Sequence, residues 1–349
     1  MMPKISIDLQ KIKENTRVLS NIFPSMKLAG VTKGVCGDPH VAKAMMDGGA
    51  QQIADSRIIN IKRMKQSGID THFLLLRSPM ISMAGDVVRW ADSSLVSDID
   101  TIRSLGNAAV EQKKEHGIIV MIDLGDRREG VLPENVNNTV EKIIDVKGAF
   151  IEGIGTNLAC YGGVIPTMEK MQKLSNVANE LEEKFGFSLS VVSGGNSANI
   201  PLMMEKGHPE RVNHMRLGES ILLGVETVGR TPIPGASQDA FTVYGELVEV
   251  QRKPSVPDGK IGQDAFGGVP EFEDRGIINM GLLALGRQDM DPESLHPLEE
   301  NIRILGANSD YTILELPAGK KTSEKLGFRP GYGTLLQAMT SPYVEKVYV

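Results

Sequence analysis

Short apolar runs alternate with longer amphipathic stretches from about residue 27 to residue 223. The runs are almost continuously hydrophobic, which is typical of strands buried on both faces of a parallel sheet. The stretches between them, such as 98–116 and 166–186, repeat apolar residues every three or four positions with charges on the other face, which indicates helices. Eight runs follow this pattern: 26–32, 51–56, 71–77, 93–98, 117–124, 149–158, 188–195 and 211–218.

These strand–helix units predict an α/β fold in which parallel strands close into a (β/α)8 TIM barrel rather than remain an open sheet. From about residue 230 the chain contains prolines, glycines and alternating strands without helical period, which indicates a β-rich module. The segment KISIDL (4–9) precedes the first helix and is expected to pair with that module. We therefore predict a barrel domain over 9–228 and a β-rich domain made of 1–8 and 229–349.

The composition favours a compact protein with a small-molecule partner. Hydrophobic residues make up 41% and charged residues 23% of 349 residues, which are ordinary globular values. A formal net charge of -6 without a Lys/Arg-rich stripe indicates neither nucleic acid nor an anionic membrane as a partner. The apolar runs are too short to cross a bilayer, and residues 1–15 lack a signal-peptide core, so a cytoplasmic location is expected.

Cysteine and histidine do not indicate a metal site. Only Cys36 and Cys160 occur, which is too few for a disulfide framework or a zinc pattern, so buried or incidental thiols are the simpler interpretation. The histidines, including His40, His208 and His214, are scattered along the chain, and surface or helix-cap positions are expected for them.

Polar residues follow the predicted strands at their carboxyl ends, where the sites of (β/α)8 barrels are built. They are Lys33, Arg77, Arg128, Asn157, the segment 193–197 and Arg216. A desolvated lysine near other cations has a lowered pKa, which suits its amine to imine formation and proton abstraction. Taken alone, a single lysine at a strand end is more simply interpreted as a solvated cap.

The loops after the seventh and eighth strands favour a functional role for Lys33. SGGNSANIP (193–201) and RLGESILLG (216–224) each combine glycines with a hydroxyl just before a helix, which frees backbone N–H groups for an anion. In (β/α)8 proteins these two loops often hold a phosphate. An amine opposite a phosphate site would serve a phosphorylated aldehyde, so the sequence predicts pyridoxal 5'-phosphate as cofactor.

Over nearly its full length the chain resembles the alanine racemase family of pyridoxal-phosphate enzymes, which are isomerases. In GVTKGVCGDP, Lys33 matches the family's cofactor lysine. Arg216 in MRLGES matches the arginine that pairs with the pyridine nitrogen, and Arg128 in DLGDRREG the arginine near the phenolic oxygen. The resemblance also implies phosphate contacts from Ser197 in GGNSA, Gly218, the backbone N–H of Glu219, and Tyr332 in GYGTLLQAM.

The chain departs from alanine racemases at three positions. Cys36 stands where they carry a tyrosine, and Asn157 where a histidine lies under the arginine. Phe266 occupies the place of the opposite-face catalytic tyrosine, and a phenyl ring cannot exchange a proton. Phrases such as DLGDRREG, GTNLACYGG and LGRQDMDP resemble instead the ornithine racemase branch, which implies a basic amino acid such as ornithine or lysine as substrate.

Racemisation by two bases needs one base on each face of the planar intermediate. Lys33 is the first, and the cation of Arg216 favours racemisation over transamination by keeping the ring nitrogen unprotonated. We expect Asp264 to be the second base; the alternative is that Asp264 only stabilises a turn. The resemblance implies that this base comes from the partner subunit of a head-to-tail homodimer.

We expect Asp289 and Asp310 to bind the distal ammonium of the substrate; the alternative is that each has only a loop or cap role.

Three other functions remain open: a non-catalytic pyridoxal-phosphate-binding protein, a decarboxylase of related architecture, and an alanine racemase proper. The added β-rich module disfavours the first, Arg216 the second, and Phe266 the third.

Overall fold

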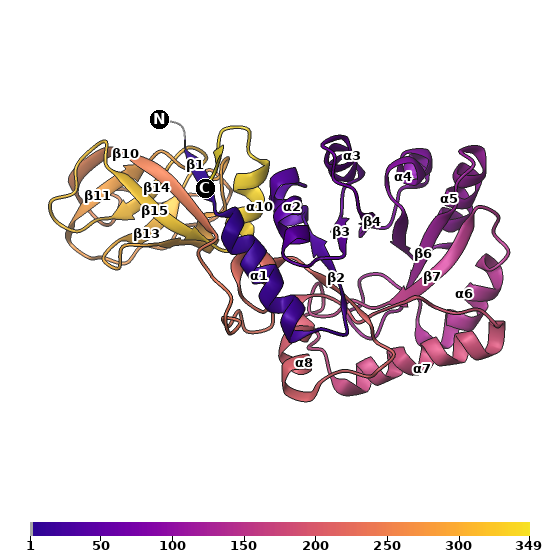
Figure 1. Cartoon of the computed structure of the whole chain (residues 1–349). Coiled ribbons are helices and arrows are strands. Elements are labelled where there is room, and N and C mark those ends of the chain that lie inside the picture. Colours follow the sequence, from indigo (N-terminus) through magenta and orange to yellow (C-terminus); the bar gives the residue numbers. More distant parts are fainter. Residues whose placement is uncertain (1–2) are drawn as a thin grey trace. The chain divides into compact units, whose positions relative to one another are not determined.

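Strands β2 to β9 close into a parallel barrel in this structure, a computed structural model that describes residues 3–349. Each strand pairs with the next, and β9 pairs with β2, so the ring has no open edge. The strands are Lys27–Val31 (β2), Gln52–Asp55 (β3), His72–Leu75 (β4), Ser93–Val96 (β5), His116–Met121 (β6), Ala149–Gly155 (β7), Val191–Ser193 (β8) and His214–Leu217 (β9). The predicted (β/α)8 barrel is confirmed (Figure 1).

Helices alternate with these strands as the periodicity predicts. They are Leu9–Ile22 (α1), Pro39–Asp47 (α2), Ile58–Gln66 (α3), Ala84–Trp90 (α4), Ile99–Glu111 (α5), Val136–Ile143 (α6), Met168–Phe185 (α7), Ile200–Lys206 (α8) and Glu219–Leu223 (α9). Side-chain caps fix several starts: Asp98 accepts from Thr101 N before α5, and Thr167 accepts from Lys170 N before α7. Among the helices of residues 3–349, none is long and apolar enough to cross a membrane.

The barrel encloses a buried apolar cluster to which β2, β3, β4, β5, β6 and β8 contribute. Its members are Ala29, Val31, Ala54, Leu74, Leu95, Ile119, Met121 and Val191. Strands β3, β5 and β6 are buried at every position, because the barrel interior covers one face and the helices the other. This two-sided burial explains why the sequence shows continuous apolar runs rather than alternation.

Several barrel strands begin with a polar residue whose side chain is hydrogen-bonded to a neighbour. His72 Nε2 lies 2.8 Å from Ser93 Oγ, and Ser94 Oγ lies 2.9 Å from His116 Nε2. His214 is bonded to Ser193 and Gln52. We call the members at strand starts the amino-end polar set: Gln52, His72, Ser93, Ser94, His116 and His214. Their partner Ser193 ends β8. The expected surface or cap position is wrong for His214, which is fully buried.

The barrel unit comprises Leu9–Gln238, and the second unit comprises the residues up to Asp8 together with Asp239–Val349. The predicted boundary at residue 228 therefore falls inside the barrel unit. Residues 229–238 stay with the barrel through hydrogen bonds from Ile233 N to Gly224 O (2.8 Å) and from Ser237 N to Asn15 Oδ1 (2.7 Å). The prolines and glycines that marked the change in pattern thus belong to a segment packed on the barrel.

The second unit is a mainly antiparallel sheet in the order β12-β15-β10-β11-β14-β13. Its strands are Lys4–Ile7 (β1), Phe241–Pro254 (β10), Ile277–Leu283 (β11), Leu295–Pro297 (β12), Arg303–Ala307 (β13), Thr312–Glu315 (β14), Lys325–Pro330 (β15) and Glu345–Tyr348 (β16), with one helix, Tyr332–Thr340 (α10). β1 pairs antiparallel with β10 and parallel with β16. The expected pairing of the N-terminal strand with the late module is confirmed.

We expect Gly153→Ala to lower the free energy of unfolding by about 3 kcal/mol, because a Cβ there would lie 2.0 Å from Val191 O on the next barrel strand. Urea denaturation of the purified protein measures the loss. The control is Gly85→Ala in α4, where the nearest atom would be 3.9 Å away, and a gain of up to about 1 kcal/mol is expected. Equal stabilities of the two variants would contradict the close approach of β7 and β8.

Candidate active site

Lys33 follows the carboxyl end of β2 and opens a short 3-10 helix, Lys33–Val35. Its side chain keeps contact with solvent, yet neighbouring atoms remove much of its hydration, and this desolvation lowers the pKa of the amine. The cations of Arg128 and Arg216 add to this lowering, whereas the carboxylate of Asp55 opposes it. The amine therefore loses its proton more readily than an ordinary lysine.

The backbone around Lys33 is held from the β3 side. Thr32 Oγ1 donates to Asp55 Oδ2 (2.7 Å), and Asn60 Nδ2 donates to Asp55 Oδ1 (3.0 Å). Burial raises the pKa of Asp55, although hydrogen bonds from Thr32, Arg57 and Asn60 oppose the rise. Because the turn then passes at positive φ through Gly37, where a Cβ would lie 2.4 Å from Asn60, only glycine fits there.

Arg216 lies on β9, with its guanidinium bonded to neutral acceptors. It donates through Nη1 to Ser193 Oγ, and through Nη2 to Thr156 O (2.8 Å) and Asn157 Oδ1 (3.4 Å). Burial lowers the pKa of Arg216 to about 10, and Glu129 opposes that shift. The side chain thus keeps its positive charge at neutral pH.

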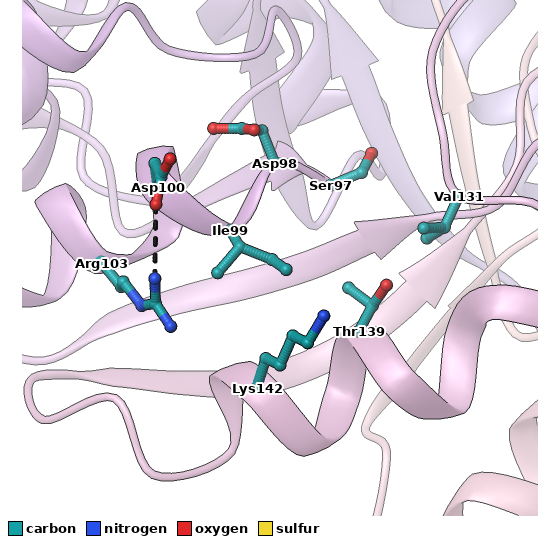
Figure 2. A pocket seen from close by; sticks show the side chains of 8 residues that line it. All are labelled: Ser97, Asp98, Ile99, Asp100, Arg103, Val131, Thr139 and Lys142. Carbon is teal, nitrogen blue, oxygen red and sulfur yellow. Dashed lines mark hydrogen bonds and ion pairs between the residues drawn. The ribbon is translucent and has the colours of Figure 1, made fainter.

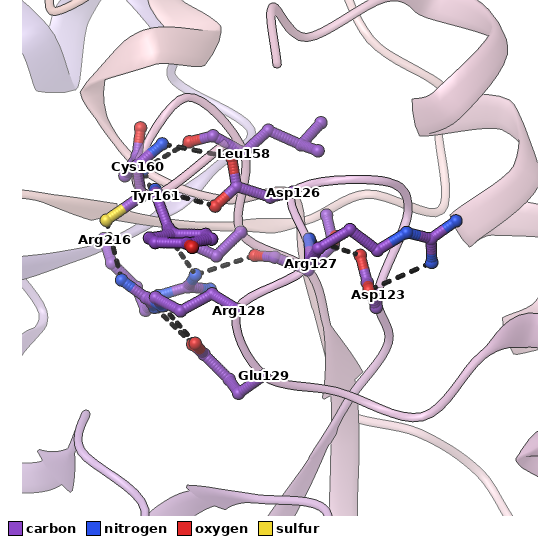
Figure 3. A network of polar contacts seen from close by, with 12 residues as sticks. Asp123, Asp126, Arg127, Arg128, Glu129, Leu158, Cys160, Tyr161 and Arg216 are labelled. Atoms are coloured by element: carbon purple, nitrogen blue, oxygen red, sulfur yellow. Dashed lines mark hydrogen bonds and ion pairs between the residues drawn. The ribbon is translucent and has the colours of Figure 1, made fainter. Parts of the chain in front are cut away.

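Arg128 follows β6 and binds two neighbours (Figure 3). Its Nε and Nη2 donate to the two carboxylate oxygens of Glu129, and its Nη1 lies 2.7 Å from Cys160 Sγ. The hydrogen bond to Glu129 raises the pKa of Arg128. Asp126 fixes the loop opposite, because its carboxylate accepts from Cys160 N (3.2 Å) and Tyr161 N (3.0 Å). Two loops that are distant in sequence are thereby joined beside Arg216.

The two glycine loops meet through their hydroxyls. Ser197 Oγ lies 2.9 Å from Ser220 Oγ and 3.4 Å from Ser220 N, so the starts of the two helical turns are side by side. Gly218 precedes α9, and a Cβ there would lie 3.2 Å from Val31 of β2. Glu219 forms an ion pair with Arg230, while burial raises the pKa of its carboxyl. The structure brings Ser197, Gly218 and Glu219 to one place, as expected from their loops.

Asn157 connects these loops to Arg216. Its Oδ1 accepts from Asn196 Nδ2 (3.1 Å) and from Arg216, whereas its buried Nδ2 has no hydrogen-bond partner within the described chain. An unsatisfied buried donor is costly, which indicates an acceptor that belongs beside it. These groups together fit a phosphorylated aldehyde. They are a desolvated amine, an amide donor without a partner in the described chain, two arginines and two adjacent helix starts.

The remaining predicted site residues belong to the second unit. Tyr332 begins α10. Asp289 is buried and accepts from Gly286 N (3.2 Å), while exposed Asp310 accepts from Gln288 Nε2 (3.0 Å) and Ser309 Oγ (3.1 Å). The hydrogen bond from Gln288 brings the loops of Asp289 and Asp310 together.

Asp264 lies in an exposed turn of the same unit. Its Oδ1 accepts from Phe266 N (2.8 Å) and Gly268 N (2.9 Å), so the carboxylate stabilises the turn while its other oxygen remains outside these bonds. The ring of Phe266 is 57% exposed and faces Arg287 at 5.1 Å. The structure therefore gives Asp264 the turn role that the sequence offered as the alternative, and a base role for it stays a prediction.

Sequence reasoning assigned no individual role to Glu129, Ser193 or His214. Glu129 was detectable as an acid beside Arg128 in a strand-end loop. Ser193 lies in the strand-end segment 193–197 marked by the sequence, but its link to Arg216, like that of His214 to Ser193, depends on which neighbours barrel closure brings to them.

A separate cavity of about 440 Å³ lies where α5 begins (Figure 2). Arg103 and Asp100 form an ion pair of 3.4 Å at its edge. None of the predicted site residues lines it; its walls are Ser97, Asp98, Ile99, Asp100, Arg103, Val131, Thr139 and Lys142.

The barrel fold agrees with comparisons to known proteins. In structure the chain is similar to the alanine racemase of Bartonella henselae with covalently bound pyridoxal phosphate, with a TM-score of 0.74, 14% identity and 100% of both chains covered. The family model of the alanine racemase N-terminal domain matches residues 7–225. The chain belongs to the alanine racemase family.

Two relatives match almost the whole chain. The ornithine racemase of Acetoanaerobium sticklandii is 41% identical over 353 residues, covering 99% of each chain. The lysine racemase of Thermotoga maritima is 41% identical over 350 residues, covering 99% of this chain and 98% of the relative.

We expect reductive methylation of Lys33 to reach its half-maximal rate below pH 10.5, because desolvation and the neighbouring arginines favour the neutral amine. Arg128→Gln removes one of those cations and raises the half-maximal pH. Peptide mass spectrometry after timed methylation measures both values. Arg103→Gln, whose arginine pairs with Asp100, is the control and should leave the profile unchanged. A higher or equal pH in the native protein than in Arg128→Gln would contradict this electrostatic account.

Proposed function

We propose that the protein is a pyridoxal 5'-phosphate-dependent racemase that interconverts the L and D forms of a basic amino acid, ornithine or lysine. The observation that carries this proposal is the desolvated amine of Lys33 beside Arg128 and Arg216, in a chain 41% identical over its whole length to an ornithine racemase and a lysine racemase.

The residues that would hold the cofactor come from different strand ends. Lys33 would hold the aldehyde carbon, Arg216 the ring nitrogen, and Arg128 with Asn157 the oxygen side of the ring. The phosphate would be bound by Ser197, Gly218, the N–H of Glu219, and Tyr332. When bound, the cofactor acidifies the Cα–H bond of an attached amino acid by conjugation with its ring.

Arg216 directs the outcome of that acidification. Its cation opposes a second positive charge on the ring nitrogen, because two adjacent like charges repel in a buried site. Its acceptors Ser193, Thr156 and Asn157 are uncharged, so none of them neutralises it. Arg216 would thereby favour return of the proton to Cα over its transfer to the cofactor.

Lys33 takes or returns the Cα proton on one face, and its lowered pKa favours the neutral amine that this role needs. For the other face we propose Asp264 from the partner subunit of a head-to-tail homodimer. Exposed apolar side chains gather on the segment that carries Asp264, which supports burial of this segment in an assembly. They are Val256, Ile261, Phe266, Val269, Phe272 and Ile277.

Asp289 and Asp310 are proposed to receive the distal ammonium of the substrate. Their adjacent loops would offer carboxylate oxygens to a charge that alanine lacks. A site built around such a pair discriminates against a substrate without the ammonium, because a buried carboxylate would be left unpaired.

A cytoplasmic location also stays a prediction.

We expect the holoenzyme to racemise ornithine or lysine and to exchange their Cα hydrogen in heavy water, with alanine at least about tenfold slower. Optical activity and Cα deuterium, followed over a panel of L-amino acids, measure both events. Lys33→Ala should abolish both. Racemisation of alanine alone would support an alanine racemase, and exchange with no amino acid would support a non-catalytic cofactor-binding protein.

The same panel tests the two carboxylates. Asp289→Asn or Asp310→Asn should raise KM for the basic substrate and leave the slow reaction of alanine unchanged. Unchanged selectivity in both variants would remove these residues from the substrate site.

We expect Asp264→Asn to reduce racemisation about 100-fold or more while Cα exchange survives for one enantiomer, because only one of the two bases is lost. Deuterium uptake from pure L and pure D substrate measures this asymmetry. Asp274→Asn is a matched control, since Asp274 also accepts from the N–H two residues ahead, Gly276 N at 2.9 Å. Equal kinetics of the two variants would show that Asp264 serves its turn alone.

A further inference from the structure

His214 is a fully buried imidazole without a role in the proton transfers proposed above. It begins β9, and Arg216 stands two residues further along the same strand. Side chains two residues apart on a strand lie on the same face, so His214 lies one layer below Arg216. The intervening Met215 is on the opposite face and is also fully buried.

A continuous hydrogen-bond chain connects the two side chains. Arg216 Nη1 donates to Ser193 Oγ, and Ser193 Oγ lies 2.7 Å from His214 Nδ1. His214 Nε2 lies 3.0 Å from Gln52 Oε1, and Gln52 begins β3 on the far side of β2. All four residues are at most 4% exposed.

Donor chemistry fixes the direction of this chain. A guanidinium has no acceptor, so Ser193 Oγ accepts from Arg216. The amide oxygen of Gln52 has no hydrogen, so His214 Nε2 donates to Gln52 Oε1. In a neutral imidazole the other nitrogen, Nδ1, then accepts, and the hydroxyl of Ser193 donates to it.

The charges around His214 favour the same neutral state. Burial lowers the pKa of His214 well below 6.5, and Arg216, Lys27 and His72 lower it further. Glu152 is paired with His72 instead, with its Oε1 3.8 Å from His72 Nε2. Gln52, the residue bonded to His214 Nε2, is uncharged.

We propose that Gln52, His214 and Ser193 are positioning residues that orient the guanidinium of Arg216 with uncharged groups, so that its cation stays directed at the ring nitrogen. This inference rests on the proposed racemase function. Ser193 offers Arg216 an acceptor whose lone pair is aligned by its donation to His214. A carboxylate in the same place would orient the guanidinium equally well but neutralise it.

The acceptor role is tested by two variants at one position. In His214→Asn the amide oxygen replaces Nδ1 and can accept from Ser193, whereas His214→Leu offers no acceptor. We expect the leucine variant of the holoenzyme to lose at least tenfold in kcat with little change in KM, and to release more keto acid per racemisation event. The asparagine variant should stay within about threefold of the native kcat. Equal losses in both variants would show a packing role and overturn the proposal.

The charge requirement is tested by Gln52→Glu. A carboxylate 3.0 Å from Nε2 raises the pKa of His214, so the imidazole takes up a proton at higher pH than in the native protein and places a positive charge behind Ser193. We expect kcat of this variant, relative to kcat of the native enzyme at the same pH, to fall as the pH is lowered from 8 to 6. A native-like pH profile in Gln52→Glu would overturn the charge argument.

A spectroscopic measurement separates this inference from the proposed function. Nuclear magnetic resonance of histidine-labelled protein without cofactor should show His214 neutral, with hydrogen on Nε2, from pH 8 to pH 6. A hydrogen on Nδ1 would overturn the chain even if racemisation is observed. Absence of racemisation with the expected tautomer would refute the function and leave the hydrogen-bond chain intact.

Discussion

Closure of the parallel strands into a ring is the constraint on which the site depends. Because all strands point the same way, their carboxyl ends meet at one rim, and Lys33, Arg128, Asn157 and Arg216 converge there from β2, β6, β7 and β9. Closure also desolvates what it gathers, which lowers the pKa values of Lys33 and Arg216. An open sheet would leave β2 and β9 at opposite edges and the two cations apart.

The two arginines of the site have different partners: Arg128 forms a salt bridge with Glu129, whereas Arg216 binds neutral groups. Arg216 binds a hydroxyl, a backbone carbonyl and an amide, while Arg128 is shared between Glu129 and Cys160. The two arginines consequently differ in effective charge. The buried one acts as an undivided cation, and the more exposed one is partly neutralised before any substrate carboxylate arrives.

Much of this arrangement could be predicted from the sequence, because the pattern of a parallel barrel is local and its strand ends are easily located. Lys33, Arg216 and Ser197 follow from that rule alone. Glu129 required knowledge of which way a loop side chain turns. Ser193 and His214 required closure itself, since a residue of β9 finds Gln52 of β3 only after the ring forms. The boundary after 228 was missed because its prolines resemble a linker, while its backbone is hydrogen-bonded to the barrel.

The amino-end polar set has a consequence for how the barrel selects one closed form. Rings of parallel strands can close with different stagger between neighbours, and aliphatic side chains tolerate such slippage with modest loss. Hydrogen bonds do not tolerate such slippage. A shift of β9 by two residues would separate His214 from both Ser193 and Gln52 and leave buried polar atoms unsatisfied. The shear of this barrel is therefore encoded in polar contacts that run from the starts of β3 and β9 to Ser193 at the end of β8.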